Sequence, residues 1–371
     1  MGQRKSSHAT LLDIARACGF SVSTVSIVLN ETPLSQKVAP ATRERVRAMA
    51  QELGYYPDAY ARSLRRQRTH TIAVLAYDLS DPFCTPIIHG IQAGLQPTSF
   101  LPLLMDARTE RKLFNSYLKM VLERRAEGVI VVANWIFEET DLLADIEKNH
   151  VPTVIVSRDL TAKNISSLLI DNEAGGALAM RHLSELGHRE IAVIRGPVEL
   201  FDSDLRWAGV QRAAAECNIR LDPRLVFQLT DMVGPASGFE GGLLLTRQIL
   251  ASGCSFTAIL AFDDLTALGV ARGLNEAGLR VPEDCSVVGF DDVPPAAMAT
   301  PAITTIRQPL MEMGSRAAQW TLKAIETPET TETSAPLLYK ASPELVVRMS
   351  SGPPRRKVSI KSFNRLHRSP Q

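Results

Sequence analysis

Long apolar runs, paired cysteines and nucleotide-binding loops are all missing from this sequence. It has no stretch of about 18 uncharged apolar residues and no signal-peptide segment, so we expect a soluble cytoplasmic protein that enters no membrane. The five cysteines are odd in number, scattered and without a CxxC pair, which argues against a disulfide framework and a zinc site. No glycine-rich dinucleotide fingerprint, phosphate loop or nucleophile elbow occurs. We therefore predict no metal, no cofactor and no catalytic residue.

What the chain does have is length for two or three domains and an uneven distribution of charge. It contains 371 residues, 45% of them apolar, with a net charge of only +1. Residues 1–70 hold 11 Lys/Arg against 5 Asp/Glu, residues 351–371 hold 6 against 0, and residues 71–350 hold 24 against 35. A basic head on an acidic body indicates that the head meets a polyanion, chance clustering being the alternative on charge alone.

Residues 10–30 have the pattern of two short helices joined by a tight turn. Thr10 is a candidate N-cap, and Asp13, three residues later, completes an approximate capping box. Gly19 suits the left-handed end of the first helix, and Ser21 can cap the second. This spacing predicts a helix-turn-helix, in which the second helix enters the major groove of DNA.

The second helix, "SVSTVSIVLN" at residues 21–30, places an isoleucine away from its own apolar stripe. At about 100° per residue, Ile27 shares a face with the polar residues Ser23 and Asn30. Ser26 lies at the flank of that face. An exposed apolar residue often has no role, but small hydroxyl groups in a basic domain favour contact with DNA.

Two further segments complete the basic head. Residues 40–54 predict a third helix, ended by Gly54, whose buried side is formed by Val46, Met49, Ala50 and Leu53. After Pro57, "DAYARSLRRQRTH" is too short for a helix that is stable alone, because helices below roughly 12 to 15 residues are marginal in water. We interpret it as a linker that folds only on a partner.

From residue 71 onward, short apolar runs alternate with amphipathic stretches. The runs that predict buried parallel strands are "TIAVLAY", "GVIVVAN", "TVIVS", "SSLLID", "EIAVIRG", "TAILAF" and "CSVVGFDD". Between them lie helices such as "NEAGGALAMRHLSELGH" and "DLTALGVARGLNEAGL". This alternation indicates an α/β doubly wound fold, with ligands at the carboxyl ends of the strands.

Two sets of motifs carry a resemblance to one family. Residues 9–70, through "LLDIARACGFSVSTVS", "VLN" and "VAPATRERVRAMAQELGYYPDAYARSLR", resemble the DNA-binding head of the lactose repressor (LacI/GalR) family of bacterial transcription regulators. The body, through "DLSDPF", "IDNEAGGALAMRHLSELGHREIAVIRG", "SDLRWAGVQRA", "DDLTALGVARGLNEAGLRVPEDCSVVGFDD" and "TTIRQPLMEMG", resembles that family's effector-binding core to about residue 349. The implied fold is an N-terminal all-α helix-turn-helix head and hinge helix, joined to a two-subdomain doubly wound core like periplasmic sugar-binding proteins.

The resemblance also implies domain boundaries. They are 1–56 for the DNA-binding domain, 57–70 for the hinge helix, 71–349 for the effector-binding and dimerisation core, and 350–371 for a basic tail. The subdomains would be about 71–170 with 307–329 and about 171–306 with 330–349, the chain crossing between them near residues 171, 306 and 330. The tail has no leucine heptad, so there is no sign of a tetramerising zipper, and its composition predicts a disordered extension.

On the DNA side, the resemblance implies contacts from the helix-turn-helix and from the hinge. Leu64 takes the place of a leucine that wedges between the central base pairs, where partial unstacking is offset by contact with a bent duplex; the alternative is an exposed leucine in a flexible linker. Many members have Arg or His in place of Ile27, whereas isoleucine cannot hydrogen bond to guanine and would pack on a thymine methyl. The DNA-binding residues are Thr10, Ser21, Val22, Ser23, Ser26, Ile27, Asn30, Tyr60, Arg62, Leu64 and Arg65.

In the core, the resemblance implies an effector cleft. Arg206 resembles the arginine that reaches into the cleft and Asp291 the cleft carboxylate, a pair suited to the hydroxyls of a small polyol or sugar. The other effector-binding residues implied are Phe83, Asp202 and Asp263. Alternatives remain for three of them: Asp291 as a turn cap, Arg206 as a salt-bridge partner and Phe83 as a core residue. Asp264 is expected to cap the helix that follows it.

We therefore predict a sequence-specific DNA-binding regulator, most often a repressor in such families. It would act as a homodimer on a near-palindromic operator, associated with the nucleoid in the cytoplasm and controlled by a small-molecule effector. The alternatives are a solute-binding protein, a regulator with a degenerate cleft, and a regulator whose purine-type corepressor strengthens DNA binding. Enzyme activity is not predicted, because no His/Asp/Glu spacing supplies a general base with an oriented partner, and His182 and His188 are better explained by helix termination.

Overall fold

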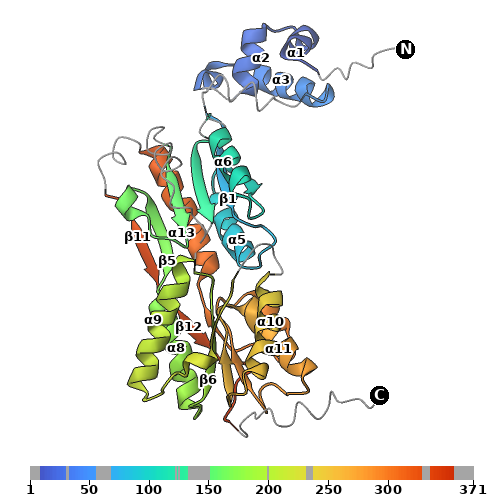
Figure 1. Cartoon of the computed structure of the whole chain (residues 1–371). Helices are drawn as coiled ribbons and strands as arrows, with labels where there is room; N and C mark the ends of the chain where they lie inside the picture. Colours follow the sequence, from blue (N-terminus) through green and yellow to red (C-terminus); the bar gives the residue numbers. More distant parts are fainter. Residues whose placement is uncertain are drawn as a thin grey trace. The chain divides into compact units, whose positions relative to one another are not determined.

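The computed structural model divides the chain into two units, Met1–Thr69 and His70–Gln371, which we describe separately (Figure 1). It describes residues 9–30, 33–55, 68–121, 123, 126–132, 151–198, 200–230, 237–327 and 335–354. Most of the predicted hinge, 57–70, and most of the predicted tail, 350–371, lie outside this set.

The first unit begins with the predicted helix-turn-helix. α1 (Leu11–Cys18) starts with the capping box: the Asp13 N–H donates to Thr10 Oγ1 at 3.3 Å, and the Thr10 N–H donates to Asp13 Oδ2 at 2.9 Å. Gly19, at φ 74°, ends α1 in the left-handed conformation. α2 (Val22–Leu29) is capped by Ser21, and it is bent by 111° from α1, which is the geometry of a helix-turn-helix.

A third helix closes the core of this unit. η1 (Pro33–Lys37) leads into α3 (Pro40–Glu52). The buried core consists of Ile14, Ala15, Cys18, Val25, Val28, Val46 and Ala50. The prediction that Leu53 belongs to the buried side is wrong: α3 ends at Glu52, and Leu53, one residue beyond, is 40% exposed.

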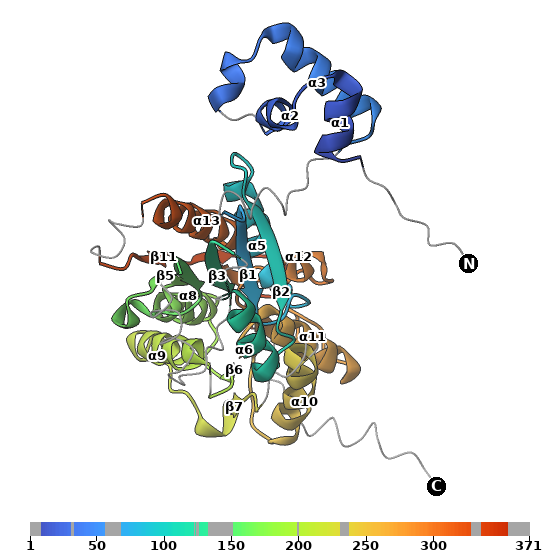
Figure 2. The same ribbon diagram turned by 90° about the horizontal axis from the view of Figure 1, so that it is seen from above.

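The second unit is built on two parallel sheets, and the first has six strands in the order β11-β5-β4-β3-β1-β2. These strands are β1 (Thr71–Ala76), β2 (Leu101–Asp106), β3 (Gly128–Val132), β4 (Thr153–Val156), β5 (Ser166–Ile170) and β11 (Leu338–Ala341). α5 (Cys84–Leu95) and α13 (Leu310–Glu326) pack on one face, and α6 (Arg111–Met120) packs on the other (Figure 2). Apolar side chains of β1 and β3 therefore alternate between two cores, as in a doubly wound sheet.

The second sheet has four strands in the order β7-β6-β8-β9, again all parallel. The strands are β6 (Ile191–Arg195), β7 (Val226–Gln228), β8 (Ala258–Leu260) and β9 (Ser286–Val288). α8 (Asn172–Glu185) and α9 (Phe201–Glu216) cover one face, while α10 (Ser237–Ala251) and α11 (Asp264–Glu276) cover the other (Figure 1). Three short helices, η3 (Thr161–Lys163), η4 (Pro223–Leu225) and α12 (Pro294–Met298), lie in the connections.

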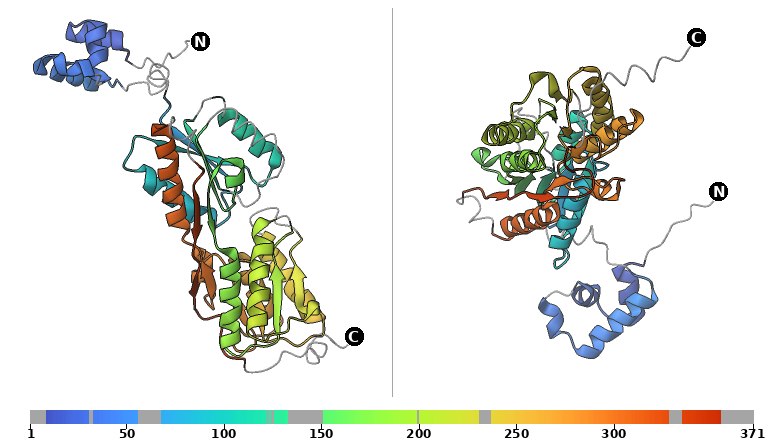
Figure 3. Two further views of the ribbon diagram at one scale, coloured as in Figure 1. Left: turned by 90° about the vertical axis from the view of Figure 1, so that its left-hand side faces the viewer. Right: turned by 90° about the horizontal axis from the view of Figure 1, so that it is seen from below.

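The chain passes between the two subdomains along β5 to α8, β10 to α13 and β11 to β12 (Figure 3). β10 (Thr305–Arg307) and β12 (Glu344–Val346) pair antiparallel. The predicted crossing near residue 330, and with it the assignment of all of 330–349 to the second subdomain, is wrong. β11 pairs in parallel with β5, so the chain crosses only after Ala341.

The second subdomain also continues past residue 349, where we expected the tail to begin. Ser350 is fully buried, and its Oγ donates to the Val287 carbonyl at 2.6 Å. The Gly352 carbonyl lies 2.9 Å from His188 Nε2, and His182 Nε2 lies 2.9 Å from the Ser351 hydroxyl. Burial lowers the pKa of both histidines. Their contacts hold Ser351 and Gly352 against the second subdomain.

Glycines let α5 and α13 approach closely. A Cβ on Gly90 would lie 2.0 Å from the Met311 carbonyl oxygen, and one on Gly314 would lie 2.0 Å from the Ile87 carbonyl oxygen.

No described helix is by itself long and apolar enough to cross a membrane; α1 and α2 meet that test only as a bent pair.

We expect Gly314→Ala to lower the free energy of unfolding by about 1–3 kcal/mol, because the two helix backbones must move apart. Gln319→Ala, on the exposed side of α13, serves as the control and should change it by no more than about 0.5 kcal/mol. Urea unfolding of the two variants measures the difference. Equal stabilities would contradict the role assigned to this close contact.

Candidate ligand-binding cleft and nucleic-acid interface

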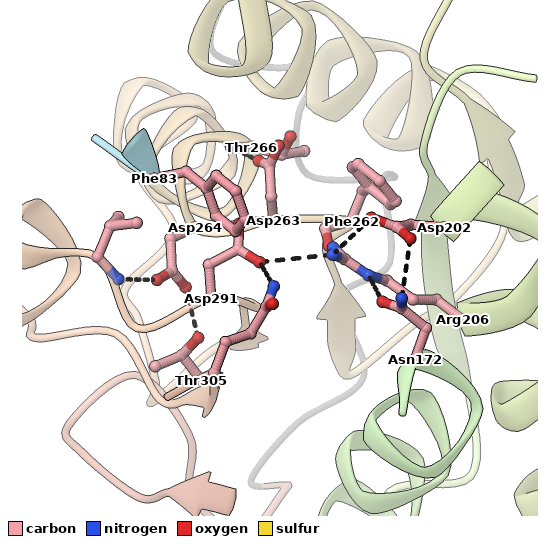
Figure 4. Close-up of polar contacts among 12 residues, drawn as sticks. Phe83, Asn172, Asp202, Arg206, Phe262, Asp263, Asp264, Thr266, Asp291 and Thr305 are labelled. Carbon is pink, nitrogen blue, oxygen red and sulfur yellow. Dashed lines mark hydrogen bonds and ion pairs between the residues drawn. The ribbon is translucent and has the colours of Figure 1, made fainter. Parts of the chain in front are cut away.

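A polar pocket lies at the carboxyl ends of strands from both subdomains. The first subdomain contributes Asp81 and Phe83, which follow β1, and the second contributes Asp202, Arg206, Phe262, Asp263, Asp264, Leu265, Asp291 and Val293. All five residues predicted for the effector site, Phe83, Asp202, Arg206, Asp263 and Asp291, therefore line one pocket (Figure 4). Strand ends are where open α/β sheets bind ligands.

Arg206, on α9, is the central cation of this pocket and is 7% exposed. Its Nε donates to Asn172 Oδ1 and its Nη1 to the Phe262 carbonyl, both at 2.8 Å. Its Nη2 lies 3.4 Å from Asp291 Oδ1 and 3.8 Å from Asp202 Oδ2. The alternative of a salt-bridge role is thus part of the observed geometry, because one guanidinium joins two buried carboxylates.

Two phenylalanine rings pack against this guanidinium group. Arg206 Cζ lies 3.8 Å from the centroid of the Phe290 ring and 4.5 Å from that of Phe262. Contacts of this kind are favourable between a cation and the faces of aromatic rings. The side chain is consequently fixed by aromatic contacts as well as by its hydrogen bonds.

The two carboxylates beside Arg206 are strongly perturbed. Burial raises the pKa of Asp202, against the opposing charge of Arg206. Burial also raises the pKa of Asp291 well above its ordinary value, and again Arg206 opposes the change. Asp202 Oδ1 accepts from Asn172 Nδ2 at 2.8 Å, and Asp291 Oδ1 accepts from Gln308 Nε2 at 2.6 Å. Each carboxylate thus depends on Arg206 and on one amide.

The backbone around Asp291 brings its side chain into the pocket. Asp291 has φ 110° and Asp292 φ 60°, values that non-glycine residues rarely adopt. The Asp291 N–H donates to the Ile306 carbonyl at 2.7 Å, which ties this loop to β10. Gln308, which contacts the carboxylate, lies between β10 and α13. Asp291 therefore joins the second sheet to a segment that crosses between the subdomains.

The expected role of Asp264 as a helix cap is wrong, and its neighbour takes that role. Asp263 is the N-cap of α11, with its Oδ1 accepting the Thr266 N–H at 2.7 Å. Asp264, 1% exposed, accepts from the Thr305 hydroxyl at 2.6 Å and from the Val293 N–H at 2.9 Å. Asp263 has the extended backbone of an N-cap residue, φ −141° and ψ 178°, whereas Asp264 is already the first residue of the helix.

Asp264 should make stability pH-dependent. Burial raises its pKa to about 7, so the folded state takes up a proton that the unfolded state releases above about pH 4. Charging this carboxyl therefore costs stability as the pH rises from about 4 to 7. We expect the wild-type free energy of unfolding, relative to Asp264→Asn, to fall by up to about 3 kcal/mol between pH 5 and pH 8. Urea unfolding at both pH values measures it.

Asp222→Asn is the matched control for this experiment. Asp222 lies in the same subdomain, and hydrogen bonds from Arg224 lower its pKa, so it stays charged from pH 5 to 8. The difference in free energy of unfolding between Asp222→Asn and the wild type should therefore be the same at pH 5 and pH 8. A constant difference for Asp264→Asn as well would show that Asp264 does not titrate there.

The predicted DNA-contacting residues of the first unit lie along α2 and its cap. Ser21, Val22 and Ser23 are exposed, whereas Ser26, Ile27 and Asn30 are half-buried. Ile27 does not belong to the apolar core of the head, in agreement with its predicted face. The other predicted contacts are Thr10, whose hydroxyl donates to Asp13 at 2.6 Å, and four residues outside the described set, namely Tyr60, Arg62, Leu64 and Arg65.

Several residues that line the pocket or contact its charged side chains were missed by the sequence interpretation. Asn172, Phe262, Phe290 and Gln308 all contact Arg206 or Asp291, and Asp81 lies on the opposite wall. The signal for Asn172 was its place directly after a predicted strand, at the start of a helix. In the described part of the chain no cluster of three or more His, Cys, Asp or Glu side chains could hold a metal ion.

A basic helix-turn-helix unit together with a two-subdomain α/β unit that encloses a polar cleft defines a class of protein, the ligand-responsive DNA-binding regulators. Residues 10–58 match the family described as bacterial regulatory proteins, lacI family. Residues 180–351 match the periplasmic binding protein-like domain.

Individual proteins are similar to this one in sequence or structure along almost the whole chain. The HTH-type transcriptional repressor PurR of Aliivibrio fischeri (strain MJ11) is 31% identical over 343 residues, covering 92% of this chain and 98% of the relative. The structure of the lac repressor dimer bound to operator and the anti-inducer ONPF has a TM-score of 0.78 at 27% identity and covers 93% of this chain and 100% of that one. The complex of the regulator CelR with cellobiose has a TM-score of 0.68 at 29% identity, with the same coverage.

The chain belongs to the lacI family of bacterial regulatory proteins. It is a DNA-binding transcriptional regulator with an effector-binding core, not an enzyme. The predicted family, fold class and regulatory function are thereby confirmed.

Proposed function

We propose that this regulator is a repressor that binds a near-palindromic operator in the cytoplasm and is controlled by a small hydroxylated effector. The observation that carries the proposal is the Arg206–Asp291 pair, 3.4 Å apart on the second subdomain's wall of the cleft. Carboxylates accept hydrogen bonds from vicinal hydroxyls and a guanidinium donates to them, so this pocket suits a sugar or polyol. The CelR–cellobiose complex supports the same ligand class.

The link between effector and operator is the pair of subdomains. Asp81 and Phe83 lie on one wall, whereas Arg206 and Asp291 lie on the other. A ligand that contacts both walls favours one relative arrangement of the subdomains, and operator affinity must change by the same coupling factor that changes ligand affinity.

A purine-type corepressor is a second candidate, because the curated relatives at 31% identity are named PurR. The two candidates predict opposite signs. A sugar inducer would weaken operator binding, and a purine corepressor would strengthen it. The degenerate-cleft alternative predicts no response to either.

The test begins with selection of bound sites from random DNA by the full-length protein. Operator affinity is then measured by fluorescence anisotropy with a panel of sugars, polyols and purines. We expect a paired half-site and at least one compound that changes the affinity by about 5- to 150-fold. An affinity that no compound changes would refute effector control.

We propose a homodimer as the functional form. In the first subdomain β2 is an edge strand whose Leu101, Leu103 and Leu104 are 71%, 40% and 41% exposed. An exposed apolar edge strand favours association with another chain. The related lac repressor structure is a dimer.

We expect Leu103→Asp to yield monomers in sedimentation experiments at micromolar concentration. Leu244→Asp, at an exposed site on α10, should leave the assembly unchanged, and a dimer in both variants would exclude β2.

A further inference from the structure

The cleft holds many more carboxylates than cations. Its lining contains Asp81, Asp202, Asp263, Asp264 and Asp291, while Arg206 is its cationic lining residue among those described. Arg158, after β4, adds positive charge at the Asp202 end, where it opposes the rise in the pKa of that carboxyl that burial causes. The excess of negative charge therefore lies at the opposite end of the cleft.

Three of these five carboxylates have strong partners within the protein. Asp202 and Asp291 share Arg206, and each accepts one side-chain amide as well. Asp264 accepts from the Thr305 hydroxyl and the Val293 N–H. Their charges or protons are thus accounted for without a ligand.

Asp81 and Asp263 are different. Each accepts one backbone N–H through Oδ1, from Phe83 at 2.9 Å and from Thr266 at 2.7 Å. Neither forms an ion pair with a described residue. Asp263 is only 7% exposed, and its second carboxylate oxygen, Oδ2, has no hydrogen-bond partner among the described residues.

These two carboxylates belong to opposite walls of the cleft and interact electrostatically. Burial raises the pKa of Asp81 to about 6, and the charge of Asp263 contributes in the same direction. Two like charges across a cleft oppose its closure unless a cation or a proton lies between them. Phe83 lines the same end of the pocket, next to Asp263 and Asp291 (Figure 4).

An aromatic face beside two carboxylates is a recognition site for an ammonium group. The same cleft already stabilises one cation in this way, since Arg206 lies between two phenylalanine rings and two aspartates. Arg206 does not neutralise Asp81 or Asp263, because its nitrogens are engaged with Asn172, the Phe262 carbonyl and Asp291.

We propose that the effector carries a protonated amine that binds between Asp81 and Asp263 against Phe83, while its hydroxyls face Arg206 and Asp291. The ligand class is an amino sugar or a similar hydroxylated amine. This inference rests on the proposed function of the cleft as a site for a small hydroxylated effector. It adds the charge that the effector must carry.

Calorimetry on the full-length protein at pH 7 tests the inference with matched probes. The probes are D-glucosamine, D-galactosamine and D-mannosamine, each compared with its neutral parent sugar and its N-acetyl derivative. We expect at least one amine to bind about tenfold more tightly than both of its uncharged counterparts, the amount that one charge-assisted hydrogen bond supplies.

Asp263→Asn is the informative variant, because the asparagine side-chain oxygen can still cap α11. It should weaken binding of the amine about tenfold more than it weakens binding of the neutral parent sugar. Asp204→Asn, on the exposed surface of α9, is the control and should change neither. Thermal unfolding of the ligand-free variants verifies that they fold.

Each outcome decides the inference. A neutral sugar that binds as tightly as its amine overturns it and leaves the proposed function intact. A panel in which no amine binds, or an amine whose affinity Asp263→Asn does not change, overturns it as well. The proposed function fails separately, when no compound of any class changes operator affinity.

Discussion

Arg206→Met is expected to produce a folded but weakened protein whose operator binding no longer responds to the effector. The substitution leaves Asp202 and Asp291 buried beside an apolar side chain, with one amide each as remaining partner. Removing one member of a buried charge cluster costs about 3–5 kcal/mol, because the remaining charges lose their compensation. We expect the free energy of unfolding at pH 7.5 to fall by that amount.

The same variant should regain stability in mild acid. Without Arg206 the pKa values of both carboxyls, already raised by burial, rise further. A folded-state pKa above the unfolded value means that stability falls as the pH rises between the two values. The deficit relative to wild type should therefore be smaller at pH 5 than at pH 7.5. Urea unfolding at both pH values, and operator anisotropy with effector, provide the measurements.

Arg212→Met is the matched control, because it removes the same side chain from the same helix. Arg212 pairs with Glu173 at 3.0 Å and Glu216 at 3.2 Å, but its side chain is 45% exposed. Exposed ion pairs contribute about 1 kcal/mol or less, so this variant should be nearly as stable as wild type and respond to effector. If both variants behave alike, Arg206 does not organise the cleft.

Much of this architecture could be predicted because its local signals agree. The capping box at Thr10 and Asp13, the left-handed Gly19 and the cap at Ser21 are each determined by residues three or four apart. The long apolar strands are buried on both faces, which gives them an unbroken apolar run. Local physics and the fold coincide at these places.

The misses have a common physical cause, since each depends on contacts distant in sequence. β2 contains Pro102 and exposed leucines, and it forms a strand only because the edge of the sheet accepts it. β11 belongs to the first subdomain because it pairs with β5, about 170 residues earlier. Ser350 and Gly352 are held by residues of β9 and by His188, which a basic tail composition conceals.

The cleft shows the same division between local and distant information. Motifs placed Arg206 and Asp291 in one cleft, but the partners that determine their chemistry come from three other segments, those of Asn172, Phe262 and Gln308. The local pattern could not decide whether Asp263 or Asp264 caps α11, because the two residues stand next to each other at the start of that helix. It is the positions of Thr305 and Val293, distant in sequence, that give the Asp264 carboxylate its buried hydrogen-bond partners.

Ile27→Arg is expected to change which operators the protein selects. Ile27 lies on α2 outside the apolar core of the head, on the face that carries Ser23 and Asn30. Isoleucine offers a guanine no hydrogen bond, whereas an arginine can donate two to its major-groove edge. One such contact is worth roughly 1–3 kcal/mol, so the preferred base opposite this position should shift to guanine by about 5- to 150-fold. Selection from random DNA with both proteins measures the shift.

Leu34→Arg separates base recognition from added charge. Leu34 is 52% exposed on η1, so this change introduces the same positive charge into the head without altering α2. Extra charge strengthens attraction to phosphates for every sequence and carries no base preference. The control should therefore bind all sites more tightly and select the wild-type half-site. A half-site unchanged by Ile27→Arg, or shifted equally by Leu34→Arg, would mean that residue 27 does not read bases, and α2 would then recognise its operator through its hydroxyl groups and the shape of the groove.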